Sequence, residues 1–352
     1  MSYSLNEKIR DLVPYEPISG SYPIRLDANE SFLEIPEHIR EDMLRRIGAL
    51  HLNRYPDPLA RGVCEGFGRY FGVDPDLLTV GNGSDELLTL LTQVMMMKGE
   101  TLVTVSPDFS MYGCYGYLAE NRCVTFPKRE DYTVDTDGLI AFALAQKARM
   151  LLFSNPCNPT GVGMPREEVL RLAEALPDCL VVADEAYMEF WNQSVMDCVG
   201  QYENLMVLKT CSKSFRMAGI RCGIAVANRT LTRALRAAKS PYNVNSMTQA
   251  AAETLFDYPR DMDAATAAVI RSRDELYGAV RALADKVPER LSLRPTCANF
   301  VYVALPDGEA ARLFAALKQE GIVVRLMGDH LRITCGSEHE NAALVRALEA
   351  NL

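Results

Sequence analysis

Four short segments of the chain place residues that could do chemistry next to apolar runs. They are GNGSDELL (81–88), NPCNPTG (155–161), VVADEAY (181–187) and KTCSKSFRMAGIRCG (209–223). Glycines and a serine at the start of a helix suit a phosphate, because the free N–H groups there carry a positive partial charge. The same positions also suit an ordinary helix N-cap at Ser84 or Asp85, so the first segment alone does not decide between the two.

The second and third segments each present one polar side chain. Flanking prolines would hold Asn158 so that its amide faces a ligand, although a plain tight turn fits the same residues. Asp184 follows the three apolar residues VVA, so we expect its carboxylate to be buried. A buried carboxylate needs a partner, and no adjacent lysine or arginine offers one. A cation on a ligand would meet that need.

The fourth segment carries two lysines and two arginines among small polar residues. A carboxylate that pairs with a pyridinium nitrogen and a lysine that forms a Schiff base are the two groups that a pyridoxal phosphate enzyme requires. A helix start that binds phosphate and a nearby arginine complete the set. The four segments together therefore predict a site for pyridoxal 5'-phosphate.

A sheet is needed to bring these segments together, and the chain from about residue 60 to 245 predicts one. Runs rich in Val, Leu and Ile alternate with amphipathic runs such as SDELLTLLTQVMM (84–96) and PREEVLRLAEAL (165–176). This alternation predicts a mostly parallel sheet with helices on both faces, and ligands of such sheets bind beyond the carboxyl ends of the strands. The predicted strands are TLVTVSP (101–107), RMLLFSNP (149–156), LVVADEAY (180–187), NLMVLKTCS (204–212) and IRCGIAVA (220–227).

The pattern changes after residue 245 to that of a smaller α+β unit. The arrangement before residue 40, with mixed polarity and early prolines, predicts an arm that is ordered by lying on something else. We divide the chain into an N-terminal arm (1–45) that packs with the small domain or a partner subunit, a large cofactor-binding domain (46–245) and a small C-terminal domain (246–352). The last is predicted to contain helices over TQAAAETLF, 263–287, 307–321 and HENAALVRALEA, and strands over NFVYVALP (299–306), IVVR and LRITC.

Composition limits the classes of function. A chain of 352 residues with 48% apolar residues suits a large α/β domain plus a smaller one. The net charge of −9 disfavours nucleic acid and anionic membranes as partners. Ten scattered cysteines without a C-x-x-C pair, and a polar start without a secretory signal, predict a reduced cytoplasmic protein with no membrane span. The four dispersed histidines predict no metal site.

The motifs, taken in chain order, resemble a known family. They are LVPYEP, LDANESF, NRYPDP, GNGSDELL, PDFSMYG, NPCNPTG, DEAYMEF, TCSKSFRMAGIRCG, PYNVNSMTQ, CANFVYV, GIVVR and LRITCGSEHEN, and they extend over nearly the whole chain. This order is similar to that of the fold-type I pyridoxal-phosphate aminotransferases and, within them, of the members that act on histidinol phosphate. The resemblance implies a fold-type I α/β fold, amino-group transfer from a small-molecule donor to a 2-oxo acid, and a homodimer with shared active sites.

The resemblance also implies roles for single residues. Lys213 occupies the lysine position of the family's S-K-x-F motif and would form the Schiff base, whereas we interpret Lys209, inside a strand, as structural or solvated. Asp184 would pair with the ring nitrogen. The other implied roles are phosphate binding by Ser84, Asp85, Thr210, Ser212 and Arg221, ring stacking by Tyr112, hydrogen bonds to the ring oxygen from Asn158 and Tyr187, and contact with the neighbouring subunit's cofactor phosphate by Tyr55.

The implied substrate site lies in the C-terminal third and the arm. Arg332 matches the arginine that the family uses for the substrate carboxylate, and Arg325 is a second cation nearby. Two arginines suit the phosphate of L-histidinol phosphate in one half-reaction and the carboxylates of glutamate, formed from 2-oxoglutarate, in the other. Tyr15, Asn29 and Asn299 are further candidates. Two alternatives on the same scaffold stay open: a threonine-phosphate decarboxylase and an aromatic amino acid aminotransferase.

Overall fold

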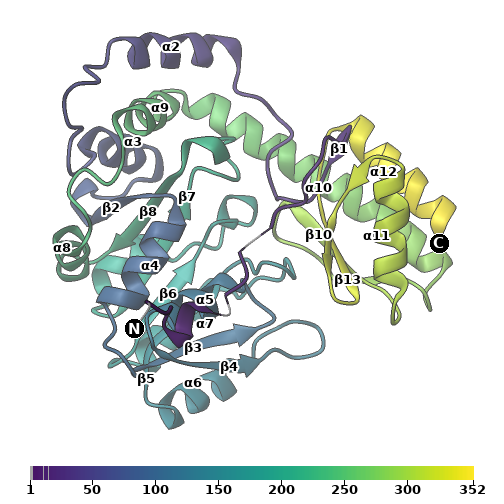
Figure 1. Ribbon diagram of the computed structural model, residues 1–352, viewed down its shortest axis with the longest axis horizontal. Helices are drawn as coiled ribbons and strands as arrows, with labels where there is room; N and C mark the ends of the chain where they lie inside the picture. The colour runs from purple at the N-terminus through teal and green to yellow at the C-terminus, as the bar shows by residue number, and fades with distance from the viewer. Residues whose placement is uncertain (1–2, 11, 15) are drawn as a thin grey trace.

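The computed structural model describes residues 3–10, 12–14 and 16–352. A seven-stranded sheet lies at the centre of its larger part, in the order β2-β8-β7-β6-β5-β3-β4 (Figure 1). β8 runs antiparallel to both of its neighbours, and the other pairs are parallel, so the predicted mostly parallel sheet is confirmed. The strands are β2 (Leu78–Asn82), β3 (Thr101–Ser106), β4 (Arg122–Pro127), β5 (Ala148–Ser154), β6 (Leu180–Asp184), β7 (Leu205–Thr210) and β8 (Cys222–Ala227).

Side chains of the central strands alternate between two helical layers. In β5, Leu151 and Phe153 join one core cluster, whereas Met150 and Leu152 join the other. Both faces are buried, which explains why these strands are continuous apolar runs. One layer contains α3 (Arg61–Phe71), α6 (Thr136–Ala145), α7 (Arg166–Ala175) and α9 (Ser246–Phe256); the other contains α4 (Ser84–Val94), α5 (Met111–Leu118) and α8 (Arg229–Ala238).

A second, antiparallel sheet in the order β12-β13-β10-β9 forms the core of the C-terminal part. Helix α10 connects the two parts, because its Met262 belongs to the core of the large sheet and its Val269 and Leu276 belong to the core of the small one (Figure 1). The elements are β9 (Ser292–Leu293), β10 (Phe300–Ala304), β12 (Arg325–Met327), β13 (His330–Thr334), α10 (Pro259–Lys286), α11 (Glu309–Gln319) and α12 (Glu338–Asn351).

The N-terminal arm adds a strand to the C-terminal part. β1 (Ile24–Arg25) pairs in parallel with β11 (Ile322–Val323), and the N–H of Leu26 donates to the carbonyl of Val323 at 2.7 Å. The arm also contains α1 (Glu7–Arg10) and α2 (Glu37–Gly48). Short 3₁₀ turns elsewhere are η1 (Pro75–Leu77), η2 (Met188–Phe190), η3 (Met196–Gln201) and η4 (Ala218–Ile220).

Two predicted elements differ from the structure. The run IVVR is not one strand, because β11 pairs with the arm and β12 pairs with β13 in another sheet. The helix predicted over 263–287 begins at Pro259, since proline suits the first turn of a helix, where its missing N–H would have no partner. The predicted boundary at residue 245 stays a prediction, although α9 beyond it packs Ala251 and Leu255 into the core of the large sheet.

Among the described residues, no helix combines the length and the apolar character that a membrane crossing requires. All ten cysteines lie within the described ranges, and each is a free thiol.

Candidate active site

The ends of three neighbouring strands meet at one edge of the large sheet. β6 ends at Asp184, which pairs in register with Ser154 at the end of the parallel strand β5. Asn158 follows β5 and Lys213 follows β7, so both lie in loops that leave the same edge. The topology therefore brings together three of the four segments selected from the sequence, and the roles of their residues stay predictions.

Asp184 is a buried carboxylate, as its apolar neighbours predicted. Its side chain is 5% exposed and accepts hydrogen bonds from the Tyr112 hydroxyl at 2.8 Å and from the Ala186 N–H at 3.2 Å. Burial raises the pKa of Asp184 to about 6, although both hydrogen bonds favour the charged form and lower it. A cation that enters the site would therefore stabilise the ionised form of this carboxylate.

Two aromatic residues lie beside Asp184. Tyr112 is 1% exposed and directs its hydroxyl to the carboxylate, while Phe109 is partly exposed and packs edge-on against Tyr112, with ring centroids 5.4 Å apart. Stacking of Tyr112 on a cofactor ring stays a prediction. Phe109 is an aromatic residue of the same segment that was not selected from the sequence, and its partial exposure makes it a second candidate for that role.

Lys213 extends toward the arm. Its Nζ donates to the carbonyl of Ala28 at 3.2 Å and lies 5.8 Å from the centroid of the Tyr187 ring. Tyr187 is buried, and its hydroxyl accepts a hydrogen bond from the Asn29 amide at 2.9 Å. Asn29 has φ of +53°, a left-handed conformation that asparagine adopts more readily than most residues. The arm therefore reaches both the lysine amine and the tyrosine hydroxyl.

The start of α4 forms a tight cradle with β8. A Cβ on Gly223 would lie 2.4 Å from the backbone of Gly83 and Ser84, so only glycine permits this approach. The N–H of Gly83 donates to the carbonyl of Arg221 at 2.7 Å, and the Arg221 guanidinium donates to Asp85 at 3.0 Å. Gly83 is the N-cap and no side chain caps the helix, so the alternative of Ser84 or Asp85 as a capping residue is wrong.

Hydroxyl groups at the end of β7 and just after it complete this cradle. The Thr210 hydroxyl donates to the Ser212 hydroxyl at 3.0 Å and accepts the Ser212 N–H at 3.1 Å, and both residues are buried. β7 and β8 pair antiparallel with Thr210 opposite Gly223, which brings these hydroxyls to the strand that contacts the start of α4. The arrangement offers N–H groups, hydroxyls and a guanidinium, the donors that a phosphate requires.

The predicted substrate residues form a second group between the small sheet and the arm. The guanidinium of Arg332 donates to the Asn158 side chain at 2.6 Å and to the carbonyl of Asp27 at 2.7 Å. Asn299 donates to the carbonyl of Asn29 at 3.1 Å, and its own side-chain oxygen is buried without a partner in the part of the chain that the structure describes. Arg325 pairs in register with Arg332 across β12 and β13.

Two predicted residues remain. Tyr15 lies outside the described residues. Tyr55 is 81% exposed and stacks on Tyr242, with ring centroids 4.5 Å apart and nearly parallel planes. The backbone carbonyls of Asp27 and Ala28 could not be found from the sequence, because side-chain types carry no signal for a carbonyl that binds an arginine or a lysine.

Helical layers on both faces of a mostly parallel sheet, with a lysine, a buried aspartate and a phosphate-type cradle at the strand ends, define the class of the pyridoxal-phosphate aminotransferase fold. The model of the family described as aminotransferase class I and II matches residues 22–350. The chain therefore belongs to the aminotransferase class I and II family, which confirms the family and the fold that the motifs predicted.

Individual relatives agree with this placement. The chain is 37% identical to a histidinol-phosphate aminotransferase from Clostridium kluyveri, over 97% of each chain. A crystal structure of histidinol-phosphate aminotransferase from Sinorhizobium meliloti, in complex with pyridoxal-5'-phosphate, has a TM-score of 0.89 at 24% identity, covering 99% of this chain and 98% of that one. L-threonine-O-3-phosphate decarboxylase from Porphyromonas gingivalis shares the fold with a TM-score of 0.79 at 22% identity, over 93% of this chain and 98% of its own.

Proposed function

We propose that this chain binds pyridoxal 5'-phosphate covalently through Lys213 and moves an amino group between L-histidinol phosphate and 2-oxoglutarate. The observation that carries the proposal is the buried carboxylate of Asp184 at the sheet edge from which the Lys213 loop also leaves. A pyridine nitrogen gives that carboxylate the cationic partner that its burial calls for, and an aldehyde gives the lysine its reaction partner.

The residues present fit this cofactor. No side chain of the described residues caps the start of α4, so its first N–H groups can donate to a phosphate, and Arg221 adds a positive charge there. The unpartnered side-chain oxygen of Asn299, buried within the described residues, offers an acceptor for a ligand donor. The raised pKa of Asp184 would return toward its ordinary value beside a ring cation, because opposite charge favours the ionised form.

Each residue then has a physical task. When bound, the cofactor supplies an aldehyde that takes up the amino group and a ring that accepts electrons. Nζ of Lys213 would hold the cofactor and, once the substrate amine has displaced it, would take the proton from the substrate Cα and pass it to the cofactor carbon that carried the aldehyde. Ionised Asp184 keeps the ring nitrogen protonated. Asn158 and Tyr187 orient the ring through its oxygen, and Tyr187 is itself held by Asn29.

Replacing Arg221 with leucine should weaken cofactor binding without unfolding the protein. Its guanidinium is 44% exposed and its partner Asp85 45% exposed, so little stability depends on the pair. A charge-assisted hydrogen bond to phosphate contributes about 1.5–3 kcal/mol, so the dissociation constant should rise by roughly 10- to 100-fold. Equilibrium dialysis of the apo-protein measures it.

Arg229→Leu is the matched control, because this exposed arginine pairs with Asp74 and Asp76 on the surface. An Arg221→Leu variant that binds the cofactor as tightly as Arg229→Leu would remove Arg221 from the phosphate site.

The donor substrate is the finer part of the proposal. Support comes from relatives named histidinol-phosphate aminotransferase, which match this chain over nearly their full length. Further support comes from two arginines that pair in register across β12 and β13. L-Histidinol phosphate has a phosphate and no carboxylate, so a guanidinium pair suits it as well as it suits the carboxylates of glutamate. Arg332 and Arg325 would hold these anions in alternate half-reactions.

A half-reaction tests the donor directly. The protein is loaded with pyridoxal phosphate, L-histidinol phosphate is added without any 2-oxo acid, and the absorption spectrum is followed. We expect the band of the lysine-bound cofactor to convert to that of pyridoxamine phosphate. Release of carbon dioxide from threonine phosphate would instead favour the decarboxylase, and conversion by aromatic amino acids alone would favour the aromatic aminotransferase.

We also propose a homodimer in which Tyr55 reaches the cofactor phosphate of the partner subunit. The apolar rings of Tyr55 and Tyr242 are 81% and 41% exposed, with Leu52 and Met247 also exposed nearby in sequence. An apolar surface of this kind is typical of an interface. Sedimentation velocity should give about twice the chain mass of 39.1 kDa, and a monomer at micromolar concentration would contradict the proposal. The cytoplasmic location stays a prediction.

A further inference from the structure

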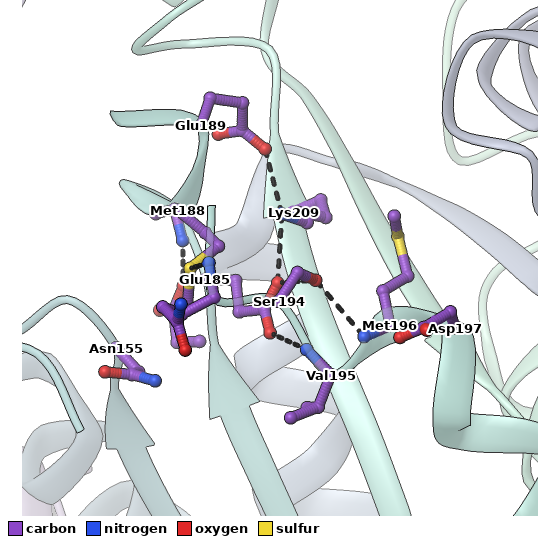
Figure 2. Close-up of polar contacts among 12 residues, drawn as sticks. Asn155, Glu185, Met188, Glu189, Ser194, Val195, Met196, Asp197 and Lys209 are labelled. Carbon is purple, nitrogen blue, oxygen red and sulfur yellow. Dashed lines mark hydrogen bonds and ion pairs between the residues drawn. The ribbon is translucent and has the colours of Figure 1, made fainter. Parts of the chain in front are cut away.

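A buried ion cluster lies in the same segments as the candidate active site. Lys209 is 3% exposed, and its Nζ lies 2.9 Å from a carboxylate oxygen of Glu185 and 2.9 Å from one of Glu189 (Figure 2). The interpretation of Lys209 as solvated is therefore wrong, and the structural interpretation holds. We call Lys209, Glu185, Glu189 and Ser194 the buried lysine cluster.

The three charged side chains of the cluster are buried, and several hydrogen bonds hold them in place. Glu185 is 0% exposed and also accepts the Val195 N–H at 2.9 Å and the Ser194 hydroxyl (Figure 2). The ammonium of Lys209 lies 5.5 Å from the centroid of the Phe71 ring. Burial lowers the pKa of Lys209, but the two carboxylates outweigh burial and raise it, so the lysine is charged. Two buried carboxylates thus depend on one ammonium.

Both glutamates of the cluster are close chain neighbours of predicted cofactor residues. Glu185 directly follows Asp184, and Glu189 lies two residues after Tyr187 on the turn η2. Successive side chains of an extended chain point to opposite sides. Contacts that hold Glu185 on one side therefore also fix the position of Asp184 on the other. The buried lysine cluster therefore lies behind the segment that presents the carboxylate and the tyrosine to the site.

The lysine loop is attached to the same cluster. Ser214, which directly follows Lys213, is buried and directs its hydroxyl to Glu189 at 3.5 Å, a long contact. Lys209 itself lies in β7, four residues before Lys213. One ammonium thus joins the strand that leads to the Schiff-base candidate with the turn that carries Tyr187.

Stability alone does not explain this choice of residues. A buried ion group is often no more stable than apolar residues of the same volume, whereas removing one partner leaves uncompensated charge. What an ion cluster does provide is a fixed relation between the backbones that it joins.

We propose that Lys209 is a positioning residue whose clamp on Glu185 and Glu189 fixes the backbone that presents the cofactor-binding side chains. The inference rests on the proposed function, because it assigns the buried lysine cluster to the cofactor site. Without the ammonium the two carboxylates repel each other, and the β6–η2 turn and the lysine loop lose their common anchor.

The test compares Lys209→Met, which keeps the volume and removes the charge, with Lys209→Arg, which keeps the charge. We expect Lys209→Met to raise the dissociation constant of pyridoxal phosphate about 10-fold or more, and to lower kcat about 100-fold with little change in KM, since small misplacements of reacting groups cost this much. Lys209→Arg should keep most of the cofactor affinity and most of kcat, because a guanidinium can bridge two carboxylates.

A matched control separates positioning from general loosening. Leu172→Ala opens a cavity under α7, so it should lower the urea midpoint of the apo-protein while leaving cofactor affinity unchanged. If Lys209→Met does not fold, Glu189→Gln keeps the shape and removes one charge, and it should shift affinity and kcat in the same direction by a smaller factor.

Three results would overturn the proposal. They are a folded Lys209→Met or Glu189→Gln variant with unchanged cofactor affinity and kcat, a failure of Lys209→Arg to improve on Lys209→Met, and a loss of affinity in Leu172→Ala equal to that in Lys209→Met. A wild-type protein that does not bind pyridoxal phosphate would instead overturn the proposed function itself, so the two failures are distinguishable.

Discussion

Substituting alanine for Lys213 should abolish turnover and leave the fold almost unchanged. The side chain is partly exposed and, among the described residues, donates a single hydrogen bond, to the carbonyl of Ala28, so its loss should cost less than about 1 kcal/mol of stability. A positioned proton-transfer group alone contributes about 10²–10⁴-fold to the rate, and the covalent link to the cofactor is lost as well. We therefore expect a fall of at least about 10⁴-fold in the half-reaction with L-histidinol phosphate.

Single-turnover absorption measurements give the rate of the half-reaction, and urea unfolding of the apo-protein gives its stability. Lys318→Ala, at an exposed position of α11, is the matched control and should change neither. A Lys213→Ala variant that keeps turnover within about tenfold of wild type would exclude this lysine as the proton-transfer group.

Asp184→Asn should make the apo-protein more stable and the enzyme much less active. Burial raises the pKa of Asp184 from 3.8 to about 6, so the folded state holds this proton more strongly than the unfolded state does. Between these two pKa values the folded state binds more protons, and the free energy of unfolding therefore falls as pH rises from about 4 to 6. Two pKa units correspond to about 3 kcal/mol, an upper estimate for this group.

Asparagine cannot ionise, and its side-chain oxygen can still accept the Tyr112 hydroxyl. The variant should thus gain up to about 3 kcal/mol over wild type at pH 7.5, and the gain should vanish below about pH 4. Activity should fall by about 10²–10³-fold, as for other losses of a preorganised electrostatic partner. Urea unfolding of both apo-proteins at several pH values measures the first effect, and the half-reaction measures the second.

The difference between the two proteins isolates this carboxylate from other groups that titrate. Asp307→Asn, at an exposed position, serves as a control and should show wild-type stability at every pH. A constant difference between wild type and Asp184→Asn from pH 4 to 7.5 would show that Asp184 is not the buried acid described above.

Local sequence was sufficient for the central sheet and for the burial of Asp184. Strands that are covered on both faces are mostly apolar, so VVA before Asp184 and LMVL before Lys209 indicated two of the strands. The glycines of the phosphate cradle were also visible, although the close approach of Gly223 to Gly83 became clear only from the pairing of β8 with β2.

Contacts between distant residues could not be predicted in this way. The N–H of Asn29 donates to the hydroxyl of Thr334, 305 positions later, and nothing near either residue indicates the other. The two-residue strand β11 owes its existence to β1 in the arm, which explains why IVVR was misinterpreted as one strand. Lys209 was ambiguous for the same reason, since its two carboxylate partners lie 20 and 24 residues earlier in the chain.

The hydrogen bonds of Arg332 affect how tightly an anion can bind. Both terminal nitrogens of its guanidinium already donate, one to Asn158 and the other to Asp27, before any substrate arrives. An arginine side chain carries about 2 kcal/mol of rotamer entropy, and ordering such a chain at an interface normally costs about 0.5–1.5 kcal/mol of binding free energy. In this protein the folded state already orders the side chain, so this entropy loss does not weaken binding. If Arg332 binds the substrate as proposed, the anion meets a preorganised guanidinium, and its affinity depends on how well it replaces these two acceptors.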